Sequence, residues 1–99
     1  MNGFEDVPEE KAFYINDGRK VKNIFELAEA ISNMKEQTFK FHVNKNKNDF
    51  SEWIRHVIGD EKLADEIARL VMKDKIQIRL QRYVIRKMLE NDNNKNFSQ

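Results

Sequence analysis

Polar and aromatic side chains gather between residues 42 and 53, and they are the residues of this chain best suited to chemistry. The stretch holds one of the two histidines, and it ends at the single tryptophan. Tryptophan beside amides and a carboxylate is a common way to hold a sugar, by ring stacking combined with hydrogen bonds. The candidate polar cluster consists of His42, Asn44, Asn48, Asp49 and Trp53.

The same five residues also suit purely structural roles. Trp53 belongs to an apolar stripe with helical spacing, which favours a place in the core. Asn44 and Asn48 can shape a polar loop, because asparagine side chains bond readily to nearby backbone. His42 can tie the end of a helix to Asp49. The sequence favours the structural roles over a ligand pocket.

Metal binding and catalysis find little support in the sequence. A metal ion would need the histidines together with carboxylates such as Asp49 and Glu52. The helical spacing of two histidines that metal sites use is missing, however, and so is cysteine. There is also no Gly-rich phosphate loop and no Gly-x-Ser-x-Gly turn. We expect no catalytic residue, no metal ligand and no cofactor, and His56 is expected at the surface.

Two helix-start signals lie close together around Trp53. Asp49 followed by Glu52 predicts a capped helix start, and Gly59 suits the left-handed position at that helix's end. Asp60 can cap a second helix at once, so Trp53 should pack in a tight corner between two short helices. The expected apolar stripes are Phe50, Trp53, Ile54, Val57 and Ile58 in the first helix, and Leu63, Ala64, Ile67, Leu70 and Val71 in the second.

Upstream of this corner the sequence predicts a β-hairpin and a helix. Asp17-Gly18 lies between two strand-like runs, which predicts a hairpin over 12–22. Asn23, with Glu26 three residues later, predicts the start of a helix over 24–34. Periodicity fits residues 39–43 equally well as helix or strand, and residues 44–48 are expected to form a polar loop.

The last predicted helix, 76–90, carries two sets of apolar residues. One broad face holds Ile76, Leu80, Tyr83, Val84 and Met88, while Ile78, Ile85 and Leu89 lie roughly opposite, counting about 100° per residue. A helix packed on one side needs only one stripe, so the second set predicts a contact with a copy of the chain or another protein. Burial by the hairpin within the monomer is the alternative. The predicted interaction residues are Ile78, Arg79, Arg82, Ile85, Arg86 and Leu89, with the arginines as the rim.

Charge is unevenly distributed along the chain, although the net charge is only +1. Residues 1–72 carry 11 Lys/Arg and 14 Asp/Glu, a net of −3, whereas residues 73–99 carry seven and three, a net of +4. A basic last helix makes a nucleic-acid-binding accessory protein the alternative function. Against it, the basic residues of this helix are spread around its circumference. No apolar run approaches 18 residues, so we expect no membrane span and a cytoplasmic location.

The 99 residues suit one domain. We expect a mobile lead at 1–11, one mainly α-helical domain at 12–90 with its small N-terminal hairpin, and a disordered tail at 91–99. About five helices should form a compact bundle. The function expected from the residues is a non-catalytic protein-interaction module that uses helix 76–90.

The stretch from His42 to Ala64 resembles a domain family of unknown function that is found mainly in archaea. The shared pattern reads HVNxxxNDFxxWIxxVIGDxxLA, and the likeness extends over roughly residues 8–72, leaving the last helix outside. It implies a compact domain without an established activity, sometimes attached to carbohydrate-active enzymes. The resemblance favours a helix at 39–43. Lys35 stands where the family usually carries a capping serine or threonine.

Overall fold

The computed structural model describes residues 4–97, and the side chains of residues 4–91. Within these residues the chain forms five α-helices and two antiparallel hairpins, as the sequence predicts for a mainly α-helical fold. The elements in order are η1 (Glu9–Lys11), β1 (Phe13–Tyr14), β2 (Lys20–Val21), α1 (Ile24–Ser32), α2 (Glu36–His42), β3 (Val43–Asn44), β4 (Lys47–Asn48), α3 (Asp49–Trp53), the π-helix η2 (Ile54–Ile58), α4 (Glu61–Ala68) and α5 (Lys73–Phe97).

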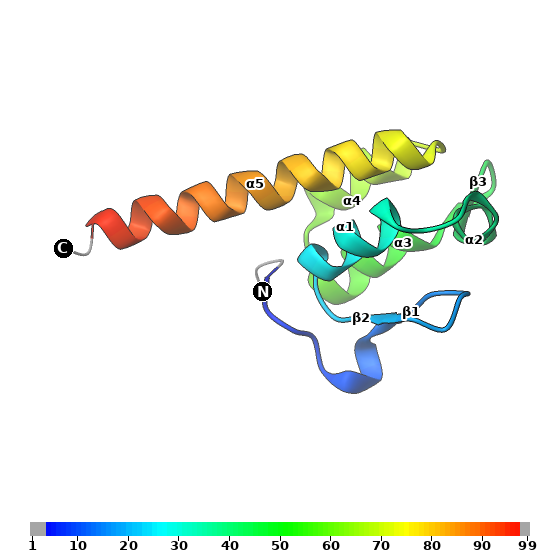
Figure 1. Ribbon diagram of the computed structural model, residues 1–99, viewed down its shortest axis with the longest axis horizontal. Coiled ribbons are helices and arrows are strands. Elements are labelled where there is room, and N and C mark those ends of the chain that lie inside the picture. Colours follow the sequence, from blue (N-terminus) through cyan, green and yellow to red (C-terminus); the bar gives the residue numbers. More distant parts are fainter. Residues whose placement is uncertain (1–3, 98–99) are drawn as a thin grey trace.

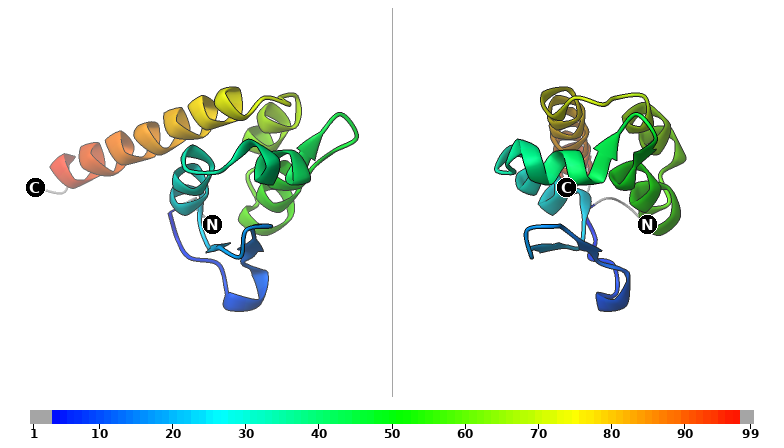
Figure 2. Two further views of the ribbon diagram at one scale, coloured as in Figure 1. Left: turned by 45° about the vertical axis from the view of Figure 1, so that its right-hand side comes forward. Right: turned by 90° about the vertical axis from the view of Figure 1, so that its right-hand side faces the viewer.

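The long helix α5 lies along one side of the molecule, and the β1–β2 hairpin lies on the opposite side (Figure 1). Helices α1, α3 and α4 fill the space between them, as the two turned views in Figure 2 also show. The C-terminal part of α5 extends past the other elements, which makes the molecule elongated, with extents of 47 × 28 × 24 Å. None of the described helices combines the length and the apolar character that crossing a membrane requires.

The predicted hairpin around Asp17-Gly18 is confirmed. Phe13 pairs with Val21 in an antiparallel register. Gly18 adopts a positive φ of 97°, a conformation that glycine reaches without steric cost. The lead before the hairpin differs from the expected mobile segment. Val7 is buried and donates its N–H to the carbonyl of Lys22 at 2.9 Å, so the chain is already packed there.

Short polar side chains cap the N-terminal ends of three helices. Asn23 accepts a hydrogen bond from the N–H of Glu26, and Asp60 accepts one from the N–H of Leu63, as the sequence predicts. The prediction that Asp49 caps α3 is wrong. The cap is Asn48, whose Oδ1 accepts from the N–H of Ser51 at 3.0 Å.

The predicted corner between two short helices forms at Gly59, and Trp53 is buried as expected, although its contacts are with the N-terminal segment. Its side chain is only 7% exposed, its ring lies 5.9 Å from that of Phe13, and its Nε1–H donates to the carbonyl of Lys11 at 2.8 Å. After Trp53 the helix widens into η2, where the N–H of Gly59 bonds the carbonyl of Ile54. Gly59 has the predicted left-handed φ of 86°, which ends the helix and starts the turn into α4.

Helix α2 and a second hairpin connect α1 to this corner. Residues 39–42 are helical, which confirms the interpretation favoured for 39–43 except at Val43, where β3 begins. Lys35 stands at the N-cap without a side-chain hydrogen bond. The stretch expected to be only a loop forms the β3–β4 hairpin, in which Val43 pairs with Asn48.

Helix α5 buries the predicted face only along its first half. Ile76, Leu80, Tyr83 and Val84 are buried, but Met88, predicted on the same face, is 49% exposed. The sequence predicts a disordered tail from residue 91, whereas the helical backbone continues to Phe97. The side chains beyond residue 91, and residues 98–99 altogether, lie outside the described part of the structure. Val71, assigned to the apolar face of the preceding helix, is also exposed, because α4 ends at Ala68.

An acidic residue of η1 holds the N-terminal segment to β2. Hydrogen bonds from Lys20 and Lys22 lower the pKa of Glu9 from 4.5 to about 2. A lowered pKa means that the pairing stabilises the fold above pH ~4.5 and loses its effect as the pH falls towards 2.

We therefore expect Glu9→Gln to lower the melting temperature slightly at pH 7, with the difference vanishing near pH 2, as followed by circular dichroism. Glu10→Gln is the matched control, and an equal pH-dependent loss in both variants would contradict the assignment.

Candidate functional site

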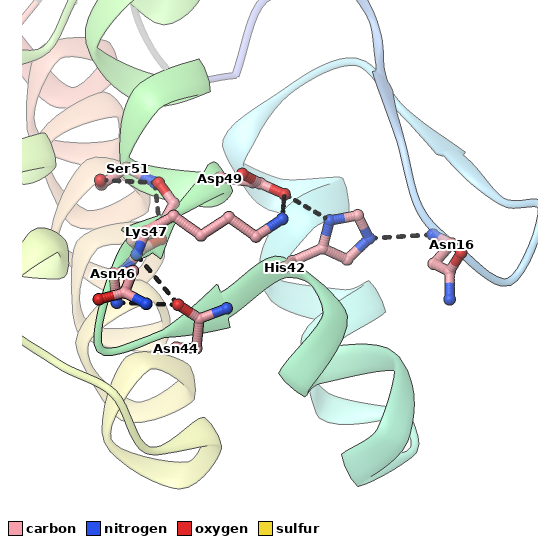
Figure 3. A network of polar contacts seen from close by, with 8 residues as sticks. Asn16, His42, Asn44, Asn46, Lys47, Asp49 and Ser51 are labelled. Atoms are coloured by element: carbon pink, nitrogen blue, oxygen red, sulfur yellow. Dashed lines mark hydrogen bonds and ion pairs between the residues drawn. The ribbon is translucent and has the colours of Figure 1, made fainter.

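His42 is the centre of the polar contacts that the sequence analysis singled out (Figure 3). Its ring is buried, its Nδ1 lies 3.1 Å from Oδ2 of Asp49, and its Nε2 accepts a hydrogen bond from the N–H of Asn16 at 2.9 Å. An acceptor at Nε2 requires the neutral tautomer that carries its proton on Nδ1, which then donates to Asp49. The predicted tie between His42 and Asp49 is confirmed, and it also joins the N-terminal hairpin to α3.

The two asparagines of the candidate cluster bond to backbone instead of lining a ligand site. Oδ1 of Asn44 accepts from the N–H groups of Asn46 and Lys47, which closes the β3–β4 turn. Nδ2 of Asn48 donates to the carbonyl of Ile67 at 3.0 Å, so the capping residue of α3 also binds the end of α4. Both residues therefore shape the chain, in the structural role that the sequence favoured.

Trp53 does not face the polar groups near His42. Its indole N–H is bonded to Lys11, and its ring lies in the aromatic core beside Phe13. A surface hollow next to the β3–β4 turn is lined by Asn44, Lys45, Asn46, Lys47, Asn48, Ser51, Glu52, Ala68 and Val71, without His42 or Trp53. The candidate cluster is thus divided among separate structural contacts, and no sugar-stacking face is presented to solvent.

Acidic residues near the histidines are already engaged with other side chains. Nζ of Lys47 lies 3.0 Å from Oδ2 of Asp49, on the same oxygen that faces His42. His56 is at the surface, as predicted, 3.1 Å from Glu52 on the next turn. Within the described residues, no three side chains of the types His, Cys, Asp or Glu come together in a group that could hold a metal ion.

Four large apolar side chains of α5 are exposed, and three of them, Ile78, Ile85 and Leu89, lie on the side that faces away from the core, which we call its outer face. Ile78 is 49% exposed, Ile85 57%, Met88 49% and Leu89 58%. Ile78, Ile85 and Leu89 recur at spacings of seven and four residues, so they form one stripe along the helix, and Met88 lies beside it on the side of the buried Val84. The β1–β2 hairpin does not cover this stripe, because the hairpin and α5 lie on opposite sides of the molecule (Figure 1).

The three arginines expected beside this stripe have different surroundings. Arg79 forms a bidentate pair with the carboxylate of Glu66, in which Nε and Nη2 donate to its two oxygens at 3.0 and 2.5 Å. These hydrogen bonds hold the pKa of Glu66 below its ordinary value, against the opposing effect of burial. Arg79 therefore fastens α5 to α4 within the chain. Arg82 and Arg86 are exposed, and Arg86 lines a hollow between α4 and α5 together with Glu66, whose pKa its charge also helps to lower.

A groove between α1 and α5 borders the outer face, and the sequence analysis did not identify it. Its volume is about 210 Å³, and its lining is Phe25, Ala28, Glu29, Ser32, Gln81, Val84 and Ile85. Phe25 is 48% exposed on the α1 side of the groove, in edge contact with the ring of Phe4. In the sequence, Phe25 is an apolar residue beside the stripe of α1, and that position is the only signal of its exposure.

The family assignment extends over nearly the whole chain. No curated protein and no solved structure matches the chain. Residues 9–98 match a family described as "Family of unknown function (DUF5752)", and this range includes α5, which the resemblance seen in the sequence left outside. The chain belongs to this family of unknown function.

Proposed function

We propose that this domain is a non-catalytic interaction module that associates with a second copy of itself through the outer face of α5. The observation that carries the proposal is the exposed stripe of Ile78, Ile85 and Leu89, with the exposed Met88 beside it, on a helix that already buries its opposite side. Contiguous exposed apolar side chains cost free energy in water and often mark protein contacts. The groove beside Phe25 extends this surface onto α1.

The rest of the molecule supports a binding role more than a chemical one. The polar groups that most resemble a site, around His42 and Asp49, bond to each other and to the backbone of Asn16. A catalytic base or nucleophile needs a free position facing a substrate, and both ring nitrogens of His42 are occupied. The archaeal distribution implied by the resemblance, and the cytoplasmic location expected from the lack of an apolar span, stay predictions.

Sedimentation equilibrium over a wide range of protein concentration tests the proposal. We expect a reversible dimer whose dissociation constant is on the order of micromolar or weaker, because a single helix face is a small interface. Ile85→Glu places a charge in the contact and should weaken association more than about tenfold. Tyr14→Glu is a matched control, since Tyr14 is 62% exposed against 57% for Ile85 and lies in the β1–β2 hairpin, on the side of the molecule opposite α5 (Figure 1).

A monomer at every concentration, or equal effects of the two substitutions, would contradict the proposal. The fold of each variant is checked by circular dichroism, because both changes are at exposed positions and should leave the helix content unchanged.

Nucleic-acid binding is the second candidate, and the exposed cations Lys75, Arg82 and Arg86 on α5 are the observation that favours it. Other basic residues that the sequence groups with them are engaged within the chain: Lys47 with Asp49, Arg55 with Asp65, Arg79 with Glu66 and Lys87 with Glu90. The two candidates differ in salt dependence. Phosphate binding weakens steeply as salt rises, whereas apolar pairing does not.

A further inference from the structure

The two edges of the outer face carry charges of opposite sign. Counting about 100° per residue along α5, Lys75, Arg82 and Arg86 lie on one side of the stripe of Ile78, Ile85 and Leu89. The other side borders α1, where Glu29 lines the groove next to Gln81 and Ile85. Asp74, in the first turn of α5, falls on this same side. At the levels of Ile78 and Ile85, the stripe therefore has basic side chains on one edge and an acidic side chain on the other.

This asymmetry distinguishes between the two ways in which identical faces can meet. In a two-fold dimer with antiparallel α5 helices, each edge meets the same edge of the partner, so Arg82 and Arg86 would approach basic residues of the other copy. In a two-fold dimer with parallel helices, each edge meets the opposite edge at the same level. Glu29 then faces Arg82 and Arg86 of the other copy, and Asp74 faces its Lys75.

We propose that the partner is a second copy of this chain bound with its α5 parallel, with Glu29 and Asp74 as the acidic residues that set this orientation. The inference rests on the proposed self-association and adds its geometry. Like charges placed opposite each other disfavour the antiparallel pairing, while complementary edges support the parallel one. The two C-terminal ends of α5 consequently lie side by side at one end of the dimer.

Disulfide cross-linking tests the orientation cleanly, because the chain contains no cysteine. Ile78→Cys and Leu89→Cys are made as separate variants of the full chain and oxidised mildly with oxidised glutathione. The two positions are 11 residues apart, or about 16 Å along the helix. A parallel pair places each position opposite itself, so both variants should form cross-linked dimers. No antiparallel register places both positions opposite themselves.

Lys45→Cys, exposed in the β3–β4 turn away from α5, controls for cross-links formed by random collision. Cross-linking of both α5 variants well above this control supports the parallel dimer. If the wild type dimerises but an equal mixture of the two variants gives only the mixed disulfide, the parallel orientation is wrong and self-association stands. If the wild type is monomeric, the proposed function fails together with the inference.

Exchanging the charges provides an independent readout. Glu29→Arg should weaken dimerisation about fivefold, because it places like charges opposite each other. Combining it with Arg82→Glu and Arg86→Glu should restore the wild-type dissociation constant. A combined variant no tighter than Glu29→Arg alone would overturn the assigned ion pairs.

Discussion

Replacing Trp53 by alanine should lower the free energy of unfolding by about 3–5 kcal/mol. The indole is 7% exposed, packs beside Phe13, and supplies the hydrogen bond that holds the carbonyl of Lys11. A domain of this size has a total stability of roughly 5–15 kcal/mol, so the variant should be largely unfolded at modest urea concentrations. Urea titration followed by circular dichroism measures the change, since the only tryptophan is removed.

Two further variants separate the contributions of the indole. Trp53→Phe keeps most of the ring volume and loses the bond to Lys11, so it should cost about 1–2 kcal/mol. Tyr14→Ala removes an aromatic side chain that is 62% exposed and should cost under about 1 kcal/mol. If Trp53→Ala cost no more than Tyr14→Ala, the place of the indole at the centre of the fold would be wrong.

The second large effect is expected at His42. Changing it to alanine should destabilise the fold by about 2–4 kcal/mol, because the N–H of Asn16 loses its partner and the carboxylate of Asp49 keeps only Lys47. The substitution also leaves a cavity beside the rings of Phe13 and Phe50, whose centroids lie 5.1 and 5.3 Å from that of His42. Equilibrium unfolding in urea measures the difference.

His56 is a control that the chain itself provides. Like His42, it has a ring nitrogen 3.1 Å from a carboxylate oxygen, but its side chain is 67% exposed against 4% for His42. His56→Ala should therefore change the stability by less than about 0.5 kcal/mol. Similar losses in the two alanine variants would show that burial of the His42 network contributes little.

Signals that depend on a few neighbouring residues were read correctly from the sequence. Asn23 and Asp60 cap their helices, and Gly59 takes the left-handed conformation, because each needs only the backbone within four residues of it. Helical periodicity likewise places Ile78 and Ile85 on the side of α5 opposite the buried Ile76 and Leu80. Such features are local, so distant contacts do not change them.

Contacts between distant residues decided the cases that the sequence left open or predicted wrongly. Asp49 and Asn48 are both good capping residues, but His42 and Lys47 bind the carboxylate of Asp49. Asn48 caps α3 instead, while its amide reaches Ile67, 19 residues further along the chain. The sequence holds no local signal for either choice.

The boundary of the outer face likewise depends on how the helices end relative to one another. Met88 shares the periodicity of the buried residues of α5, yet it is 49% exposed. The C-terminal part of α5 extends beyond the rest of the molecule, so no other element covers it there (Figure 1). The groove beside Phe25 arises only when α1 packs against α5. Helical periodicity gives the direction of a side chain, whereas its burial requires knowledge of the neighbouring element.

The weight-average mass of the wild-type chain at sedimentation equilibrium tests the central claim most directly. Association through the outer face of α5 predicts a mass that rises with concentration from 11.9 kDa towards twice that value. The rise should persist at high salt, because apolar side chains form most of the contact. A mass that stays at 11.9 kDa at the highest concentration reached would contradict self-association.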